Sequence, residues 1–510
     1  MRILRRDFVR ALGGSGACAT LPSSFWKSQA SDSRERLAAD PLRPQYHLLP
    51  AKNWMNDPNG PIYWKGHYHM FFQYNPNAAV WGDMHWAHAL SADMIHWRHL
   101  RIALAPTPGG DDANGCFTGS AVDDHGTAAI LYTGVKTVAP EQATLRDGVH
   151  NFREVQCLAT SDDPQLLTWT KWDQPVLQPP KDPRLAGFRD PFLWREGENW
   201  YLGVGSGLFK QGGRVLLYRS KDLRQWEYLH PLASGKWTGK ESSNPVDSGE
   251  MWECPDFFPL GKKHVLLYST AGQVIWESGE LDPKKHVFHS ERRGILDHGA
   301  YYAQKTQLDA QGKRILWGWI PETRAEAEFS AAGWAGCMAL PRVLSLNSDG
   351  GLEMQVAGTQ TLRAKSFVLP GRHADLSQMG HAMEEIQIEN LAGELAWKIK
   401  SPRFTFTLAD RSGSWWSAKL EPKGAAAVTL TANGVALEVP LGPKHEIEFH
   451  LFLDASVAEL ICDRQHVLTT RIYRKPEGVL RPRFSDNDLP ALVSLEAWQL
   501  RPISADRLTT

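Results

Sequence analysis

Short β-rich runs dominate the hydrophobic pattern of the chain, and helical periodicity is scarce. In the first 340 residues one unit recurs, in which a turn-forming segment precedes an aromatic or aliphatic run. The unit begins at residues 66, 126, 198, 263 and 313, so successive copies are 60, 72, 65 and 50 residues apart. The five runs are GHYHMFFQY, GTAAILYTG, ENWYLGVGS, KHVLLYST and KRILWGWI. Five copies at this spacing predict radial repetition of four-stranded sheets.

A second repeated pattern follows three of these runs. It occurs as SADMIHW (91–97), SDDPQLLTW (161–169) and SKDLRQW (220–226). Together the two patterns predict a five-bladed β-propeller over residues 40–346. An array of β-sandwiches is the alternative, although it would not obviously give five similar units.

After LPRVLSL, residues 340–346, the pattern changes to short strands with alternating apolar and polar positions. Examples are RFTFTLA, AAVTLTA and HVLTTRIY. This alternation predicts an antiparallel β-sandwich over residues 360–507. The chain is therefore expected to be all-β, a five-bladed β-propeller followed by a C-terminal β-sandwich. No long low-complexity linker separates the two parts, so we expect them to pack firmly together.

The first 30 residues differ from the rest of the chain. LRRDFVRALGG carries Arg5 and Arg6, then Phe8 and a mild apolar run, which resembles a twin-arginine export signal. We therefore expect residues 1–30 to direct export and the mature protein to be periplasmic or extracellular. The run is too short and too weakly apolar to anchor the protein in a membrane. A disordered basic N-terminus is the alternative.

Composition excludes several classes of function. The 56 basic and 57 acidic residues nearly cancel and form no basic stripe, so nucleic acid is not an expected partner. The 21 Trp are numerous for this length, and Trp faces commonly stack on sugar rings, although most are expected to fill the core. The cysteines are widely spaced and lack a metal-binding pattern. We expect no metal and no organic cofactor.

Three acidic residues occupy similar places in the repeat. Asp57 in WMNDPNG precedes the first repeated run, Asp190 in GFRDPFLW the third, and Glu253 in MWECPDFF the fourth. Strands that begin the blades of a propeller line its central channel, so these acids should converge at one end of the axis. Paired carboxylates flanking a bond carry out glycoside hydrolysis. Crowding and tryptophan cover raise the pKa of at least one such carboxyl group.

Several segments resemble glycoside hydrolase family 32, which includes invertases, inulinases, levanases and related fructosyltransferases. The segments are NWMNDPNG (53–60), QYNPNAAVWGDMHWAHALSADMIHW (73–97), FTGSA (117–121), GFRDP (187–191), WECPD (252–256), RILWGWI (314–320) and GWAGCMALPRVLSL (333–346). The resemblance runs from about residue 45 to the C-terminus, because FLDASVAELICDRQHVLTTRIY is similar to the sandwich domain of the family.

The resemblance implies a retaining β-fructofuranosidase that acts on sucrose or fructans. It implies that Asp57 is the nucleophile, that Glu253 is the general acid/base and that Asp190 stabilises the transition state. The residues implied to line the pocket for the terminal fructosyl unit are Trp54, Asn56, Gln73, Trp81, Phe117, Thr118, Arg189 and Trp319. Arg189, adjacent to Asp190, is expected to hold that acid ionised. This dense polar and aromatic lining suits a closed pocket and thus an exo-acting enzyme.

Three other functions remain open. An arabinanase-like propeller hydrolase would act on another furanose, but the pairing of WMNDPNG with ECPD argues against it. A propeller lectin would bind sugar without cleaving it, but all three acids are present. A fructosyltransferase would use a sugar in place of water as the acceptor. The choice between water and a sugar as the acceptor depends on loops around the pocket mouth. Neither that choice, nor the choice among sucrose, inulin and levan, nor the oligomeric state follows from the motifs.

Overall fold

The structure is a computed structural model that describes residues 33–369, 376–442, 446–485 and 487–505. The expected export signal, residues 1–30, lies outside the described residues. Strands dominate, and the helices are few. They comprise a helix that includes residues 33–39, α2 (Glu326–Ala332), α3 (Leu376–Glu385) and the 3₁₀ helices Pro140–Gln142, Thr359–Leu362 and Leu489–Ala491. The prediction of an all-β protein is confirmed. Within these ranges no helix is long and apolar enough to cross a membrane.

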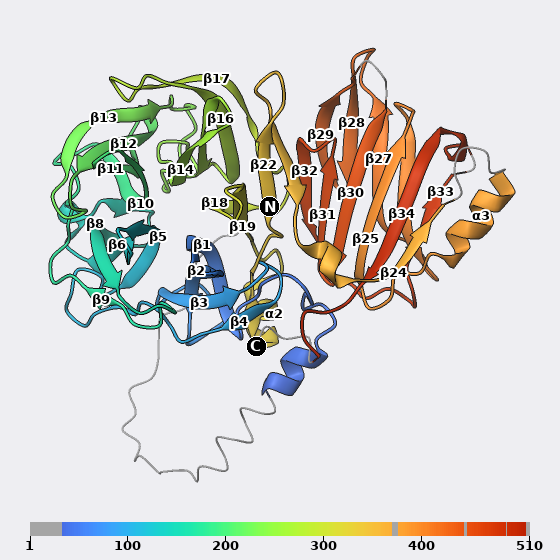
Figure 1. The fold of residues 1–510 in the computed structure, drawn as a ribbon, viewed down its shortest axis with the longest axis horizontal. Coiled ribbons are helices and arrows are strands. Elements are labelled where there is room, and N and C mark those ends of the chain that lie inside the picture. Colours follow the sequence, from blue (N-terminus) through green and yellow to red (C-terminus); the bar gives the residue numbers. More distant parts are fainter. Residues whose placement is uncertain (1–32, 370–375, 443–445, 486, 506–510) are drawn as a thin grey trace, which may run out of the picture.

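Residues 53–356 form five sheets arranged in a ring, called here the ring region (Figure 1). The first sheet holds β1 (Asn53–Trp64), β2 (His67–Asn75), β3 (His85–Ser91) and β4 (Trp97–His99). The second holds β5 (Gly115–Asp124), β6 (Thr127–Thr137), β7 (Leu145–Arg146), β8 (Asn151–Ser161) and β9 (Thr170–Lys171). The third holds β10 (Leu185–Glu196), β11 (Asn199–Leu208), β12 (Gly212–Ser220) and β13 (Glu227–Ser234).

The last two sheets complete the ring. The fourth holds β14 (Glu253–Leu260), β15 (Lys263–Thr270), β16 (Gln273–Leu281) and β17 (Phe288–Ile295). The fifth holds β18 (Tyr302–Leu308), β19 (Arg314–Ile320), β21 (Cys337–Met338), β22 (Arg342–Leu346) and β23 (Leu352–Val356). β23 therefore extends the fifth sheet beyond residue 346. β20 (Trp334–Ala335), which follows β19 in the chain, belongs to the first sheet, where it pairs in parallel with β1. It therefore joins the end of the ring to its beginning.

The repeated runs seen in the sequence have defined places in these sheets. Each aromatic or aliphatic run is the second strand of a sheet, β2, β6, β11, β15 or β19. The second pattern forms the turn between the third and fourth strands of three sheets. There an indole N–H donates to the carbonyl oxygen of the residue three positions earlier, in the pairs Trp97 and Met94 (3.0 Å), Trp169 and Leu166 (2.9 Å), and Trp226 and Leu223 (3.1 Å).

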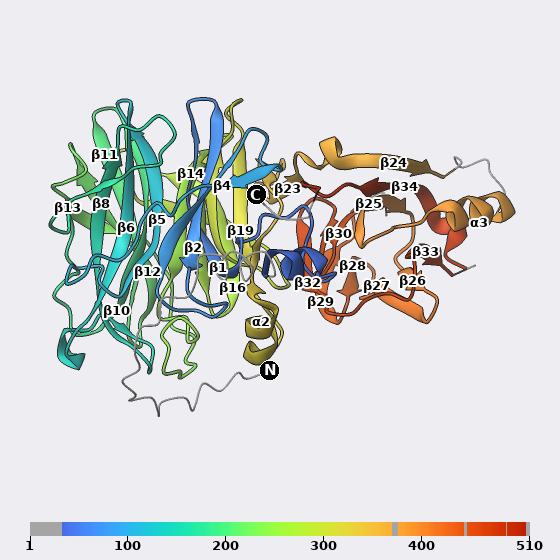
Figure 2. The same ribbon diagram turned by 90° about the horizontal axis from the view of Figure 1, so that it is seen from below.

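Residues 363–500 form two further sheets, called here the two-sheet region (Figure 2). One holds β24 (Arg363–Val368), β25 (Ala392–Ile399), β30 (Ile447–Asp454), β31 (Val457–Cys462), β32 (His466–Arg471) and β34 (Leu492–Leu500). The other holds β26 (Phe404–Asp410), β27 (Gly413–Pro422), β28 (Ala427–Ala432), β29 (Val435–Pro440) and β33 (Arg481–Phe484). Their alternating apolar residues share one hydrophobic cluster, in which Trp397 stacks on Phe406 and Phe449.

Buried charges join the two regions. Arg342 of β22 donates to Glu459 of β31 at 2.5 Å, and both side chains are fully buried. His47 contacts Asp454 at 2.8 Å and Glu459 at 2.9 Å. Burial lowers the pKa of His47, but its hydrogen bonds to these two carboxylates raise it to about 9, so the imidazole of His47 is protonated at neutral pH. Removing one partner of a buried ion pair costs about 3–5 kcal/mol, so this network holds the regions in a fixed relation.

Candidate active site

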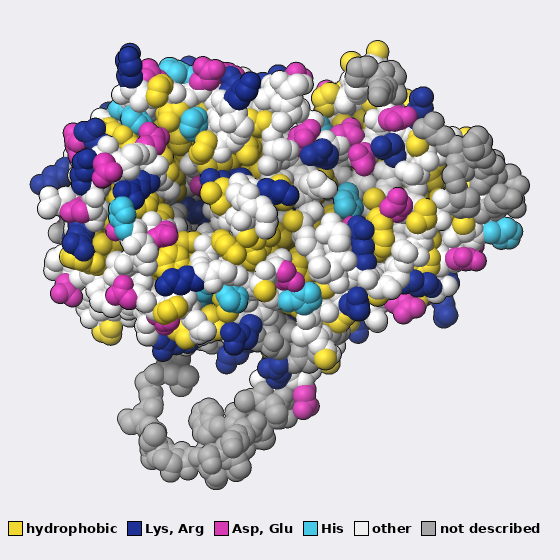
Figure 3. All heavy atoms as spheres, in the orientation of Figure 1, with side chains coloured by type: hydrophobic (Ala, Val, Ile, Leu, Met, Phe, Trp, Pro, Cys, Tyr) yellow, Lys and Arg dark blue, Asp and Glu magenta, His cyan; other side chains and the backbone are white. Residues whose placement is uncertain are grey.

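A cavity of about 240 Å³ opens at the ring region, and the space-filling view shows this face hollowed near the middle of the ring (Figure 3). Its lining draws on the first strand of every sheet, β1, β5, β10, β14 and β18. Each of these strands contacts the next around the ring, and β18 contacts β1 again. Ten of the eleven site residues expected from the sequence line the cavity, namely Asn56, Asp57, Gln73, Trp81, Phe117, Thr118, Arg189, Asp190, Glu253 and Trp319.

Trp54 is the expected site residue that does not line the cavity. Its side chain packs against Trp319 and Phe329, with ring centroids 5.8 Å and 5.9 Å away. Its indole Nε1–H donates to Asn56 Oδ1 at 2.7 Å. Trp54 therefore supports the cavity wall from behind and orients the Asn56 amide.

In four of the five sheets, the first strand contains a β-bulge that begins with a residue of positive φ. These residues are Gly60 (42°), Asp190 (63°), Cys254 (48°) and Ala303 (54°), and proline follows the first three. Proline has no N–H, so a bulge at that position leaves no donor unpaired. At Gly60 a Cβ atom would lie 2.8 Å from the Ala121 nitrogen, which only glycine avoids.

The bulges also show how the three acids are staggered. Asp190 is itself the left-handed residue, Glu253 lies one position before Cys254, and Asp57 lies three positions before Gly60. The acids thus share the first strand of their sheets, but they occupy different positions along it. The sequence therefore predicts correctly that the three acids lie on equivalent strands, but they do not lie at equivalent positions along those strands. This stagger directs three carboxylates from different sheets into one cavity.

Asp57 is held by donors from three neighbours. Asn56 Nδ2 donates to Oδ1 at 3.0 Å, Thr118 Oγ1 donates to Oδ2 at 2.6 Å, and the Cys254 thiol lies 3.4 Å from Oδ2. Burial raises the pKa of Asp57, and the Glu253 charge adds to this, whereas the Thr118 and Asn56 hydrogen bonds lower it. The two firm hydrogen bonds also fix the direction of the carboxylate.

Asp190 has the most strongly shifted acid group in the cavity. Burial raises its pKa to about 7, with further contributions from Glu253 and Asp57, and Arg189 only partly opposes them. Its own N–H donates to Thr133 Oγ1 at 2.9 Å, and its Oδ2 accepts the Cys254 N–H at 2.8 Å. The charge of Arg189 lowers the pKa of Asp190, as expected, but burial outweighs this effect, and the guanidinium donates its hydrogen bonds to Glu253 and Glu154.

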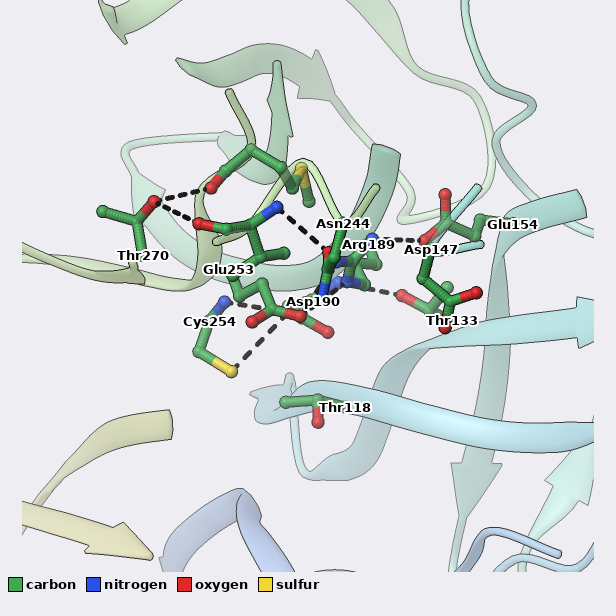
Figure 4. A network of polar contacts seen from close by, with 12 residues as sticks. Thr118, Thr133, Asp147, Glu154, Arg189, Asp190, Asn244, Glu253, Cys254 and Thr270 are labelled. Atoms are coloured by element: carbon green, nitrogen blue, oxygen red, sulfur yellow. Dashed lines mark hydrogen bonds and ion pairs between the residues drawn. The ribbon is translucent and has the colours of Figure 1, made fainter. Parts of the chain in front are cut away.

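Arg189 instead joins two glutamates (Figure 4). Its Nε and Nη2 donate to Glu253 Oε1 at 3.1 Å and 2.8 Å, and its Nη1 donates to Glu154 Oε1 at 2.8 Å. Burial lowers the pKa of Arg189, but Glu253, Glu154 and Asp190 raise it far above its usual value. The guanidinium therefore stays charged and neutralises part of the acidic cluster.

Sequence reasoning did not identify Glu154 or Tyr302. Glu154 is fully buried on β8, but its neighbours in sequence include Arg153 and Gln156, so no local pattern marks it as a buried acid. Tyr302, at the start of β18, lines the cavity and donates from Oη to Glu253 Oε2 at 2.8 Å. No sequence signal distinguished Tyr302 from the neighbouring Tyr301.

The rim of the cavity carries a second set of residues that the sequence did not single out. His150 Nδ1 contacts Asp147 Oδ2 at 2.9 Å, and the His150 ring lies 5.2 Å from Trp81 and stacks on Phe152 at 4.8 Å. Burial raises the pKa of Asp147, but hydrogen bonds from His150 and Val149 lower it to about 2. This rim therefore presents a carboxylate beside aromatic faces.

The arrangement suits acid/base chemistry at a bond between two sugar units. It brings together carboxyl groups with different hydrogen-bond partners, one way to give them different protonation states. Aromatic faces and paired polar groups surround them, as in sites that recognise sugars. Among the residues that the structure describes, no group of three or more His, Cys, Asp or Glu could hold a metal ion.

Comparison with known proteins identifies the family. The profile of the glycosyl hydrolases family 32 N-terminal domain matches residues 47–356. The chain belongs to glycosyl hydrolase family 32. It is therefore a glycoside hydrolase, and the resemblance seen in the sequence is confirmed.

Relatives cover most of this family 32 chain. Sucrose-6-phosphate hydrolase of Escherichia coli is 34% identical over 488 residues, which is 90% of this chain and 94% of that protein. Raffinose invertase of Escherichia coli is 38% identical over 364 residues, 66% of this chain and 70% of that protein. The structure of the Bombyx mori GH32 β-fructofuranosidase BmSUC1 aligns with a TM-score of 0.74 at 30% identity, covering 94% of this chain and 99% of that one.

The shifted pKa of Asp190 predicts a stability cost. A carboxyl group with a pKa of about 7 in the folded protein and an ordinary value in the unfolded chain binds more protons when folded, so stability falls as the pH rises between those values. Asp190→Asn should therefore raise the free energy of unfolding near pH 8 by up to roughly 4 kcal/mol, and much less near pH 4. Asparagine also tolerates the left-handed backbone at this position. Urea unfolding at both pH values measures the difference.

Asp147→Asn is the matched control, because its sign is opposite. The pKa of Asp147 is about 2, so its ionised form stabilises the fold above the ordinary value, and this stabilisation is lost as the pH falls through about 2. Asp147→Asn should therefore destabilise the protein near pH 8. An Asp190→Asn variant less stable than the parent near pH 8 would contradict the assignment.

Proposed function

We propose that this family 32 enzyme hydrolyses the terminal β-D-fructosyl bond of sucrose, with fructans such as inulin and levan as further substrates, and retains the anomeric configuration. The observation that carries the proposal is the cavity itself, in which Asp57, Asp190 and Glu253 meet from three sheets. The names of the relatives support it, and the Bombyx mori enzyme has been solved as a variant in complex with sucrose. In the same proposal, the ring region is a five-bladed β-propeller and the two-sheet region a β-sandwich.

Each acid has a role in this mechanism. Asp57 attacks the anomeric carbon, while Glu253 protonates the departing glycosidic oxygen. Glu253 then takes a proton from water, which releases fructose from Asp57. Asp190 holds sugar hydroxyls and, when ionised, stabilises the positive charge that develops on the fructosyl ring. The donors on Asp57, Asn56 and Thr118, keep the nucleophile directed toward the sugar.

Removing either reacting group should abolish most activity. Asp57→Asn or Glu253→Gln should lower kcat on sucrose by at least about a thousandfold, because each removes a group that forms or breaks a bond. Initial rates of glucose and fructose release measure the loss, and circular dichroism checks the fold. Glu227→Gln is the control, because Glu227 is an exposed acid on β13, away from the cavity. Near-normal turnover by either active-site variant would defeat the assignment.

The acceptor can also be a sugar, as in fructosyltransferases. We favour water, because the side chain of Glu253 is about 23% exposed, so that water can reach the group that would activate it. The same assay distinguishes the two. Hydrolysis releases glucose and fructose in equal amounts, whereas transfer leaves free fructose well below glucose and yields longer oligosaccharides.

The charges of the cavity favour a neutral substrate over a phosphorylated one. The lining holds the four carboxyl groups of Asp57, Asp147, Asp190 and Glu253 but only two arginines. Arg189 is bound to two glutamates, and Arg146 Nε donates to the Ala143 carbonyl oxygen at 2.9 Å. A phosphate on the glucosyl unit would add about −1.5 to −2 charges to this acidic mouth.

We therefore predict that kcat/KM for sucrose exceeds that for sucrose 6-phosphate by at least about tenfold, because like charges in contact are costly. Paired initial-rate assays on the two substrates measure the ratio. Asp147→Asn should narrow it, because it removes a carboxylate from the rim. Preferential cleavage of sucrose 6-phosphate, the substrate in the names of several relatives, would contradict this prediction.

The size of the cavity favours exo attack. At about 240 Å³ it is smaller than the roughly 300–1,000 Å³ of pockets that enclose drug-sized ligands, so it accommodates one sugar unit and not a continuing chain. On inulin, free fructose should accumulate from the first time point without a ladder of intermediate oligosaccharides. Chromatography of a time course tests this. Early release of mixed oligosaccharides would show endo attack instead.

A further inference from the structure

The two carboxylate oxygens of Glu253 have different partners. Oε1 accepts two N–H groups of Arg189, from Nε at 3.1 Å and from Nη2 at 2.8 Å. Oε2 accepts the Tyr302 hydroxyl at 2.8 Å. An arginine cannot accept a hydrogen bond or lose its proton in a protein, so a proton on Oε1 would face two fixed donors. Among the described residues, Oε2 accepts a hydrogen bond from one neutral donor, which leaves a lone pair available.

We propose that Oε2 is the atom of Glu253 that gives and takes the proton, and that Tyr302 is the positioning residue that orients it. Arg189 fixes Oε1, and the Tyr302 hydroxyl fixes Oε2, so the carboxyl group cannot rotate to exchange them. This inference rests on the proposed function, because it concerns the proton that Glu253 transfers during cleavage.

The proton inventory follows from this assignment. In the first step the O–H bond at Oε2 breaks, and the proton joins the departing glycosidic oxygen. That oxygen takes the electron pair of its bond to the fructosyl carbon, while Asp57 forms a new bond to the same carbon. In the second step water attacks that carbon, its proton passes to Oε2, and the bond to Asp57 breaks with its electrons returning to the carboxylate. The enzyme ends in its starting state.

Tyr302 is suited to remain a donor throughout this cycle. It is the first residue of β18, it lines the cavity, and it pairs across the sheet with Trp319. Burial raises the pKa of the Tyr302 hydroxyl far above its usual value, and the Glu253 charge adds to this, so the hydroxyl keeps its proton over the working pH range. The other charged or titratable groups that face Glu253 are Arg189, Asp190, Asp57 and Cys254.

The hydrogen bond is stronger when Glu253 is ionised, because a charged acceptor binds a donor more tightly than a neutral one. Tyr302 therefore favours release of the proton during the first step. Without this donor Glu253 would hold its proton to higher pH. The limb of the kcat/KM profile that falls as the general acid ionises would then move to higher pH.

Tyr302→Phe removes this donor and keeps the ring. We expect kcat/KM on sucrose to fall roughly ten- to hundredfold, the usual effect of losing a hydrogen bond to a charged group. On 4-nitrophenyl β-D-fructofuranoside, whose leaving group needs little protonation, kcat/KM should fall less than about threefold. The high-pH limb of the kcat/KM profile on sucrose should shift by about one unit to higher pH, which corresponds to a tenfold change in the ionisation constant.

Tyr301→Phe is the matched control. Tyr301 precedes Tyr302, is about 2% exposed, and has a hydroxyl without a hydrogen-bond partner among the described residues. Its loss should leave both the rates and the pH profile unchanged. Thermal unfolding of both variants within a few degrees of the parent shows that the fold is kept.

The outcomes separate this inference from the proposed function. A parent enzyme that cleaves neither sucrose nor the aryl fructoside would overturn the proposed function, and this inference with it. An active parent whose Tyr302→Phe variant loses equal activity on both substrates would overturn only the inference. So would a variant that loses activity on sucrose while its high-pH limb stays in place.

Discussion

The bond between Arg189 and Glu253 sets the charge balance on which the active site depends. Four carboxyl groups, those of Asp57, Glu154, Asp190 and Glu253, lie close enough to interact electrostatically, and this single guanidinium binds Glu253 and Glu154 directly. Burying such a cluster is costly unless each charge is paired or takes up a proton. Arg189 compensates Glu253 and Glu154 directly. Asp190 takes up a proton more readily instead, because burial raises its pKa to about 7.

The first strands of the five sheets make this crowding possible. Their bulges place Asp190 and Cys254 in left-handed backbone, a conformation that costs non-glycine residues on the order of 1–3 kcal/mol each. The strain is offset locally, because the Asp190 N–H donates to Thr133 and the Cys254 N–H donates to Asp190. A site built in this way sacrifices stability for geometry, as is common at functional sites.

Much of the fold could be predicted because the repeated runs follow the period of the strands. The residues expected at the site also lie together, since turn-forming motifs such as Asp-Pro mark the bulges of the first strands. The partners of Arg189 could not be predicted, because Glu154 and Glu253 belong to other sheets and lie 35 and 64 residues away in sequence. Tyr302 and Glu154 carry no local signal of their contacts. Trp54 belongs to the same motif as Asp57, but its indole packs against Trp319 and Phe329 and does not line the cavity.

The central claim is that cleavage passes through a fructosyl group bonded to Asp57. The direct test uses Glu253→Gln, in which the second step lacks a base while an activated aryl fructoside still reacts in the first. Rapid acid quenching, proteolysis and mass spectrometry of this variant should find one fructosyl unit on the peptide that contains Asp57. A fructosyl group on the peptide that contains Asp190, or inverted fructose formed by the parent enzyme without any adduct, would contradict the account.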